Sequence, residues 1–176
     1  MFQLSEQPAN IKFTPRVEKH GPDKVPACTL NMSLKGPNTL LDFFDTDLRA
    51  FLFMPPPEGE KDLADQGDED GGYLSKIRFP ELGKKQDWSY EGGGYRAVIG
   101  GGLNTDNDLI FVECKLDKFS FTFEQGGTVC ITFNITCDPN EKEAGRLYKL
   151  NGSEVDLTLE PPSAEDQAQM DLDNAA

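Results

Sequence analysis

The feature that most constrains the fold is an alternating run, KFSFTFEQGGTVCITFNI, at residues 118–135. Apolar side chains occupy every second position on both sides of Gly126 and Gly127, which is the period of a strand with one buried face. A turn centred on Gly126 would pair Phe123 with Val129, Phe121 with Ile131, and Phe119 with Phe133. The pattern therefore predicts one long antiparallel hairpin over residues 115–137, at the centre of a sheet.

Other segments also show the strand period. Residues 28–35 alternate without a break, and Cys28, Leu30, Met32 and Leu34 share one face. Residues 11–17 alternate too, but Pro15 cannot donate a ladder hydrogen bond, so we expect an edge strand. Further strands are expected near residues 73–79, 87–91, 95–100 and 153–160.

Two segments show helix signals. The apolar spacing of residues 39–52 predicts a helix capped by Asn38 or Asp45 and broken near 45–47. Residues 138–152 predict a short helix, with Asp138 as N-cap and Pro139 in its first turn. The total of about eight strands and two short helices predicts a mainly β fold, an antiparallel β-sandwich or OB-like barrel.

The length of 176 residues fits one domain. We expect a single β-rich domain over residues 1–160, containing a mobile acidic loop at 56–72. Residues 161–176 are acidic and have no apolar stripe, so we expect a disordered tail.

The net charge of −14 is unevenly distributed. Residues 36–72 carry −8 and residues 160–176 carry −5, which leaves only −1 for the rest of the chain. The whole-chain charge suggests that nucleic acid would repel this protein. A body this close to neutral is nevertheless not excluded from binding nucleic acid.

Sequence signals for catalysis, metals and cofactors are weak. The four cysteines lack zinc-site spacing and His20 is the only histidine, so we expect reduced thiols and no metal or cofactor. No arrangement of nucleophile and base is apparent, which favours a non-enzymatic protein. The sequence shows neither a secretory signal nor a long apolar run, so we expect a cytoplasmic location and no membrane partner.

Basic and aromatic residues interleave between positions 76 and 96. Single-strand binders use this mixture, because bases stack on rings while cations contact phosphates. The alternative is that the rings are core residues of strands. The candidate nucleic-acid-binding residues are Lys76, Arg78, Lys84, Lys85, Trp88, Tyr90, Tyr95 and Arg96. The glycine runs at 92–94 and 100–102 lack a following helix, so they predict a bulge or turn and a kink rather than a phosphate loop.

Two other classes of function stay open. An acidic DNA mimic would inhibit a host nucleic-acid-binding or defence protein through its carboxylates. The candidate residues for that contact are Asp65, Asp68, Glu69, Asp70, Asp171 and Asp173. A structural or assembly protein would instead pair a free sheet edge with a partner, and a homo-oligomer is possible.

The run RFPELGKKQDWSYEGGGYRAVIGGG and the later EVDLTLEPP resemble small uncharacterised proteins of tailed phages and prophages. The layout, a near-neutral β body with an acidic tail, also resembles phage single-stranded-DNA-binding proteins. That resemblance implies binding to single-stranded DNA, or to a nucleic-acid-processing protein of recombination or replication. The tails of those proteins commonly end in an aromatic or apolar residue, whereas this chain ends in DLDNAA, so recruitment through the tail is in doubt.

Overall fold

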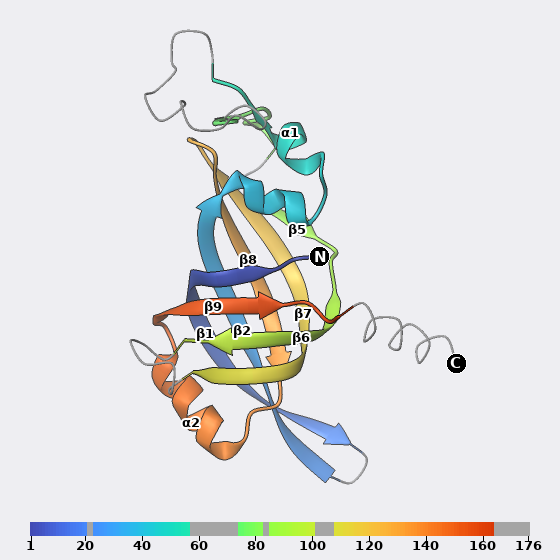
Figure 1. The fold of residues 1–176 in the computed structure, drawn as a ribbon, viewed down its shortest axis with the longest axis vertical. Helices are drawn as coiled ribbons and strands as arrows, with labels where there is room; N and C mark the ends of the chain where they lie inside the picture. Colours follow the sequence, from blue (N-terminus) through green and yellow to red (C-terminus); the bar gives the residue numbers. More distant parts are fainter. Residues whose placement is uncertain (21–22, 57–73, 83–84, 101–107, 164–176) are drawn as a thin grey trace, which may run out of the picture. The chain divides into compact units, whose positions relative to one another are not determined.

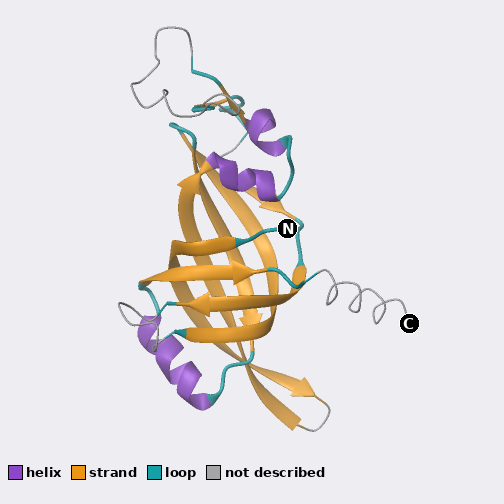
Figure 2. Cartoon of the chain, viewed as in Figure 1, coloured by secondary structure: helices purple, strands orange, loops and turns teal. Residues whose placement is uncertain are grey.

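A computed structural model describes residues 1–20, 23–56, 74–82, 85–100 and 108–163 (Figure 1). Most of its regular structure is strand (Figure 2). The strands are β1 (Leu4–His20), β2 (Asp23–Pro37), β3 (Phe53–Met54), β4 (Lys76–Ile77), β5 (Lys85–Trp88), β6 (Gly92–Ile99), β7 (Leu109–Glu124), β8 (Thr128–Cys137) and β9 (Glu154–Glu160). The helices are a 3-10 helix, η1 (Asn38–Phe43), and two α-helices, α1 (Leu48–Leu52) and α2 (Glu141–Leu150).

Seven strands form one antiparallel sheet, in the order β5-β7-β6-β9-β1-β2-β8. Because β7 also pairs with β8, the strands β7, β6, β9, β1, β2 and β8 form a closed ring of pairings. The prediction of a mainly β antiparallel fold is confirmed, and the pairing pattern is barrel-like. Strands β3 and β4 form a separate two-stranded sheet.

The chain divides into two compact units. Unit 1 contains residues 1–34, 89–119 and 132–176, and unit 2 contains residues 35–88 and 120–131. The sequence predicted a single domain over residues 1–160 and did not indicate this division into two units. The acidic loop and nearly all of the tail lie outside the described residues.

Aromatic packing fills the core of unit 1. The ring of Phe2 meets Phe119 and Phe133 edge-on, with centroid distances of 5.4 Å for both pairs. Phe119 and Phe133 stack face to face at 5.0 Å, as expected for cross-strand neighbours. Each of these three rings is at most 1% exposed. The stacked pair has the register that the sequence predicts for the hairpin.

The burial of the hairpin confirms the predicted apolar face. Phe121 is 1% exposed, whereas its neighbour Thr122 is only half-buried. The β8 residues that share the apolar face are all fully buried: Val129, Ile131, Phe133 and Ile135. The four residues predicted for one face of the 28–35 strand are buried as well: Cys28, Leu30, Met32 and Leu34.

Strand β7 begins at Leu109, before the predicted start of the hairpin at residue 115, and its alternation is interrupted at two residues with positive φ. Glu113 and Lys118 have positive φ angles of 56° and 55°, although neither is glycine. Val112 and Glu113 are both exposed, so the strand resumes its inward face one position later, at Cys114. On β6, Gly94 has φ 70° and lies where the β6–β7 register shifts, which agrees with the predicted glycine bulge.

The prediction that this segment is an edge strand is wrong, because β1 pairs with both β2 and β9. The β9 pairing ends at Asn10, however, so Pro15 lies where only β2 is paired to β1. Proline has no N–H to donate, and it is tolerated there as at a sheet edge because no strand on the other side needs that donor.

Both helix predictions need corrected caps. Helix α2 begins at Glu141, and its N-cap is Asn140 rather than Asp138. The Asn140 side chain accepts from the Glu143 N–H, and the Glu143 carboxylate accepts from the Asn140 N–H, both at 2.9 Å. This reciprocal capping box satisfies two otherwise free amides at once and fixes the start of the helix at Glu141. The predicted break near residues 45–47 is confirmed by the separation of η1 from α1.

The turn of the hairpin is held within unit 2. The amides of Gly126 and Gly127 donate to the Ser75 carbonyl at 2.9 and 3.1 Å. The Gly127 carbonyl accepts from the Asn38 N–H at 2.9 Å, and the buried Asn38 side chain donates to the Leu74 carbonyl at 2.7 Å. Asn38 therefore joins two segments instead of capping η1 as predicted.

We expect Phe121→Ala to cost roughly 3–5 kcal/mol of the free energy of unfolding, because it leaves a cavity beside Phe44 and Trp88. Ile110→Ala on the same strand is the control, since Ile110 is 50% exposed and its loss should cost less than about 1 kcal/mol. Denaturant unfolding measures both. Equal losses would contradict the burial of Phe121.

The two turn glycines give a matched pair of variants. Both have positive φ, but a Cβ on Gly126 meets nothing within 4 Å, whereas a Cβ on Gly127 lies 3.0 Å from the Leu74 carbonyl oxygen. Gly126→Ala should cost about 1 kcal/mol from backbone strain alone. Gly127→Ala should cost more, because the turn must also move away from Leu74. A smaller melting-temperature loss for Gly127→Ala would refute this packing.

Candidate nucleic-acid interface

The candidate interface is built on the two-stranded β3–β4 sheet of unit 2. Phe53 pairs with Ile77 and Met54 with Lys76, and the Arg78 N–H donates to the Leu52 carbonyl at 2.9 Å. Phe53 is fully buried and meets Phe123 edge-on at 5.9 Å, which anchors the small sheet to β7. This anchor fixes the segments immediately before and after it.

An apolar pocket of about 540 Å³ lies against this sheet. Its walls come from α1, from β4 and the turn after it, and from residues 122–125 of β7. The residues of the first two segments are Leu52, Ile77, Phe79, Pro80 and Leu82. The turn is closed by the Leu82 N–H, which donates to the Phe79 carbonyl at 3.0 Å. The volume is in the range of pockets that bind small ligands or single groups of larger ones.

Large exposed apolar side chains line this pocket or lie beside a lining residue. Phe79 and Leu82, which line it, are 41% and 43% exposed, and Phe51 is 57% exposed. The rings of Phe51 and Phe79 lie side by side, with centroids 5.3 Å apart and planes tilted by 46°. We call Phe51, Phe79 and Leu82 the apolar rim.

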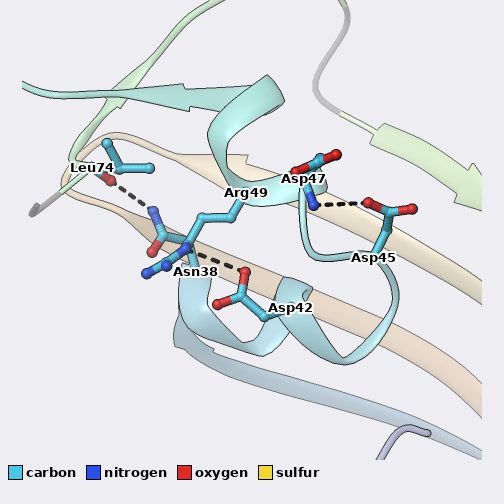
Figure 3. A network of polar contacts seen from close by, with 6 residues as sticks. All are labelled: Asn38, Asp42, Asp45, Asp47, Arg49 and Leu74. Atoms are coloured by element: carbon cyan, nitrogen blue, oxygen red, sulfur yellow. Dashed lines mark hydrogen bonds and ion pairs between the residues drawn. The ribbon is translucent and has the colours of Figure 1, made fainter. Parts of the chain in front are cut away.

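Figure 3 shows the polar contacts that fix the segment before Phe51. The Asp45 carboxylate accepts from the Asp47 N–H at 2.8 Å, and Arg49 Nε lies 3.2 Å from the Asp42 carboxylate. These contacts hold the turn between η1 and α1. They help to position Phe51 on α1. Arg49 is already paired with Asp42.

Charged residues of both signs lie in and beside the pocket segments. Glu124, a wall residue, is neutralised by an ion pair with Lys35. Lys76 and Arg78 alternate with the wall residues Ile77 and Phe79 along the chain, and neither has an acidic partner within ion-pair distance among the described residues. Within the described part of the chain, two cations without ion pairs thus lie on the same segment as the exposed ring of Phe79.

The other predicted nucleic-acid-binding residues of unit 2 differ in their exposure and in their contacts. Lys85 lies 3.6 Å from the carboxylate of Asp87, and both side chains are exposed. Trp88 is half-buried, with Phe44 and Phe121 at centroid distances of 6.4 and 6.0 Å. Trp88 therefore contributes to the packing of unit 2. Lys84 lies outside the described residues.

Three predicted residues belong to unit 1. Tyr95 is 1% exposed and its hydroxyl lies 2.7 Å from that of Tyr90, whose ring meets Phe119 edge-on at 5.4 Å. Arg96 pairs with Glu160 at 2.7 Å. The prediction that Tyr95 offers a stacking face is wrong, because β6 turns that residue into the core.

The candidate partner-binding acids are not placed. Asp65, Asp68, Glu69, Asp70, Asp171 and Asp173 all lie outside the described residues. The described residues also contain no group of three metal-ligating side chains arranged around a common point.

Sequence reasoning missed the apolar rim. The helical spacing of residues 39–52 treats Phe51 as a core residue, yet α1 is only five residues long and buries Leu52 instead. Phe79 precedes Pro80, where an extended or turn conformation is favoured, and this was the available signal that it leaves the strand.

Comparison of the chain with protein-family models, curated proteins and solved structures gave no match. In the described part of the chain, none of the helices has the length and apolarity needed to cross a membrane.

Tyr95 gives a prediction that depends on pH. Burial, followed by the hydrogen bond with Tyr90, raises the pKa of Tyr95 well above its ordinary value. Its contribution to stability is present below about pH 10, the pKa of an unfolded tyrosine, and is lost as the pH rises above that value. Tyr95→Phe should cost about 1 kcal/mol at neutral pH.

The same substitution should reduce the fall in stability above pH 10, because phenylalanine cannot ionise. Denaturant unfolding at neutral and alkaline pH measures both effects, and Tyr148→Phe is the control because Tyr148 is 73% exposed. If Tyr95→Phe behaves like Tyr148→Phe at both pH values, the buried hydroxyl pair does not form.

Proposed function

We propose that this protein is a non-enzymatic module that binds single-stranded DNA at the pocket and apolar rim of unit 2. The observation that carries the proposal is the exposed Phe79 ring on the same short segment as two cations without described ion pairs, Lys76 and Arg78. A base stacked on Phe79 would cover apolar surface, while the cations would contact the phosphates.

The pocket favours a strand with unpaired bases over a duplex. The bases of a duplex are stacked on one another, so a ring at a pocket mouth cannot reach their faces without opening the helix. An unpaired base can enter a pocket of about 540 Å³. The ion pair of Glu124 with Lys35 lowers the repulsion that a carboxylate in the wall would otherwise exert on phosphate.

The resemblance to phage single-stranded-DNA-binding proteins supports the choice of DNA and suggests a role beside recombination or replication proteins. The near-neutral charge of the chain outside residues 36–72 and 160–176 is compatible with that role. The acidic tail would then compete with DNA for the same cations.

The test is fluorescence anisotropy of a labelled single-stranded oligonucleotide and its duplex, at low and moderate salt. Phe79→Ala should lose about 1–3 kcal/mol of binding free energy, the usual contribution of one stacked base. Tyr148→Ala is the matched control, since it removes an exposed aromatic side chain of unit 1. Equal affinity for single strand and duplex would contradict the proposal.

The cations give an independent test. Replacing both Lys76 and Arg78 with Ala should weaken binding and reduce the salt slope by about 1 for each lost phosphate contact. Arg96→Ala should change little, because Arg96 is already paired with Glu160 in unit 1. If neither the wild-type protein nor any variant binds the oligonucleotide at low salt, single-stranded DNA is not the ligand.

A further inference from the structure

Two cysteines of unit 1 are in direct contact. Cys28 lies in β2 and Cys137 is the last residue of β8, the neighbouring strand of the sheet. Their sulfur atoms are 3.4 Å apart, and the residues are 0% and 4% exposed. Both are free thiols.

The contact follows from the strand register. Asn31, three residues after Cys28, donates from Nδ2 to Oδ1 of Asn134 at 3.0 Å, and Asn134 lies three residues before Cys137. One antiparallel register therefore places both pairs directly opposite each other. Opposite residues in such a pair have Cα atoms about 4.5–5.5 Å apart. A disulfide requires about 4.4–6.8 Å, so the strands need not move for one to form.

We propose that Cys28 and Cys137 are a redox modification site, at which hydrogen peroxide converts the two thiols to a disulfide across β2 and β8. The Cys28 thiolate attacks one peroxide oxygen and the O–O bond breaks, which gives Cys28 sulfenic acid and, after protonation, water. The Cys137 sulfur then attacks the Cys28 sulfur, the S–O bond breaks, and the hydroxide leaves as water with the Cys137 proton. In total, two thiols and one peroxide give one disulfide and two waters.

The pKa directions of the two thiols favour this order of the steps. The pKa of Cys28 is lowered chiefly by the hydrogen bond with the Cys137 thiol. Hydrogen bonds with Cys114 and Cys28, together with burial, raise the pKa of Cys137. Because the thiolate is the reactive form, Cys28 is oxidised first and Cys137 resolves it. Cys114 is the competing third thiol.

The disulfide would stabilise the closed ring of pairings. It would join residues 109 positions apart in sequence, and a cross-link over so long a loop removes much conformational freedom from the unfolded chain. The position of Cys137 at the end of β8 gives the peroxide a route that requires only local opening of the strand end.

The test uses the full chain treated with hydrogen peroxide, followed by alkylation of the remaining thiols in denaturant and peptide mass mapping. We expect one peptide that links Cys28 to Cys137 and two alkylated cysteines, Cys114 and Cys130. The melting temperature should rise by several degrees, and a dithiol reductant should reverse the rise.

Two variants control the assignment. Cys130→Ala, which removes a half-buried thiol that is not one of the pair, should leave the linked peptide unchanged. Cys28→Ala should abolish both that peptide and the melting-temperature rise. Four intact thiols in the peroxide-treated wild-type protein, or a bridge through Cys114 or Cys130, would overturn the proposal. The wild-type map decides the question even if Cys28→Ala does not fold.

Discussion

The pairing of β7 with β8 is the constraint on which the rest of the structure depends. Without it the seven strands would form an open sheet, whereas with it six of them close into a ring. The pairing is supported by apolar burial, since the stacked rings of Phe119 and Phe133 lie against Phe2 in the core of unit 1. In unit 2, the same hairpin supplies Phe121 and Phe123, which pack against Phe44 and Phe53.

The hairpin also links the fold to the candidate site. Residues 122–125 of β7 form one wall of the pocket, and the glycine turn that follows holds residues 74 and 75 by hydrogen bonds. Those residues lead directly into β4 and then to Phe79. The apolar rim therefore stands on segments that are anchored by the buried residues Leu52 and Phe53 and by the hydrogen bonds of the turn.

Sequence periodicity predicted the long paired strands, because a half-buried strand must alternate whatever its partner is. It was less accurate for the short ones, since the strand expected near residues 73–79 is only Lys76–Ile77 and the one expected near 87–91 is Lys85–Trp88. It was misleading at positions that break the period. The bulges at Glu113 and Lys118 require positive φ from residues that give no such signal, and Pro15 signalled an edge although β1 has partners on both sides over different lengths. The Asn140 cap was available from the Asn-x-x-Glu spacing, and Asp138 was preferred only because Pro139 follows it.

By itself, the sequence determined the β class of the fold, the register of the hairpin and the buried face of each alternating strand. These follow from local alternation and glycine turns. Only the tertiary structure decided which aromatic residues are available to a ligand. Tyr95 and Phe79 both lie in extended segments next to a cation, yet Tyr95 is buried beside Tyr90 and Phe79 is an exposed residue that lines the pocket. The physical reason is that alternation identifies two faces of a strand, whereas exposure depends on which segments, distant in sequence, cover each face.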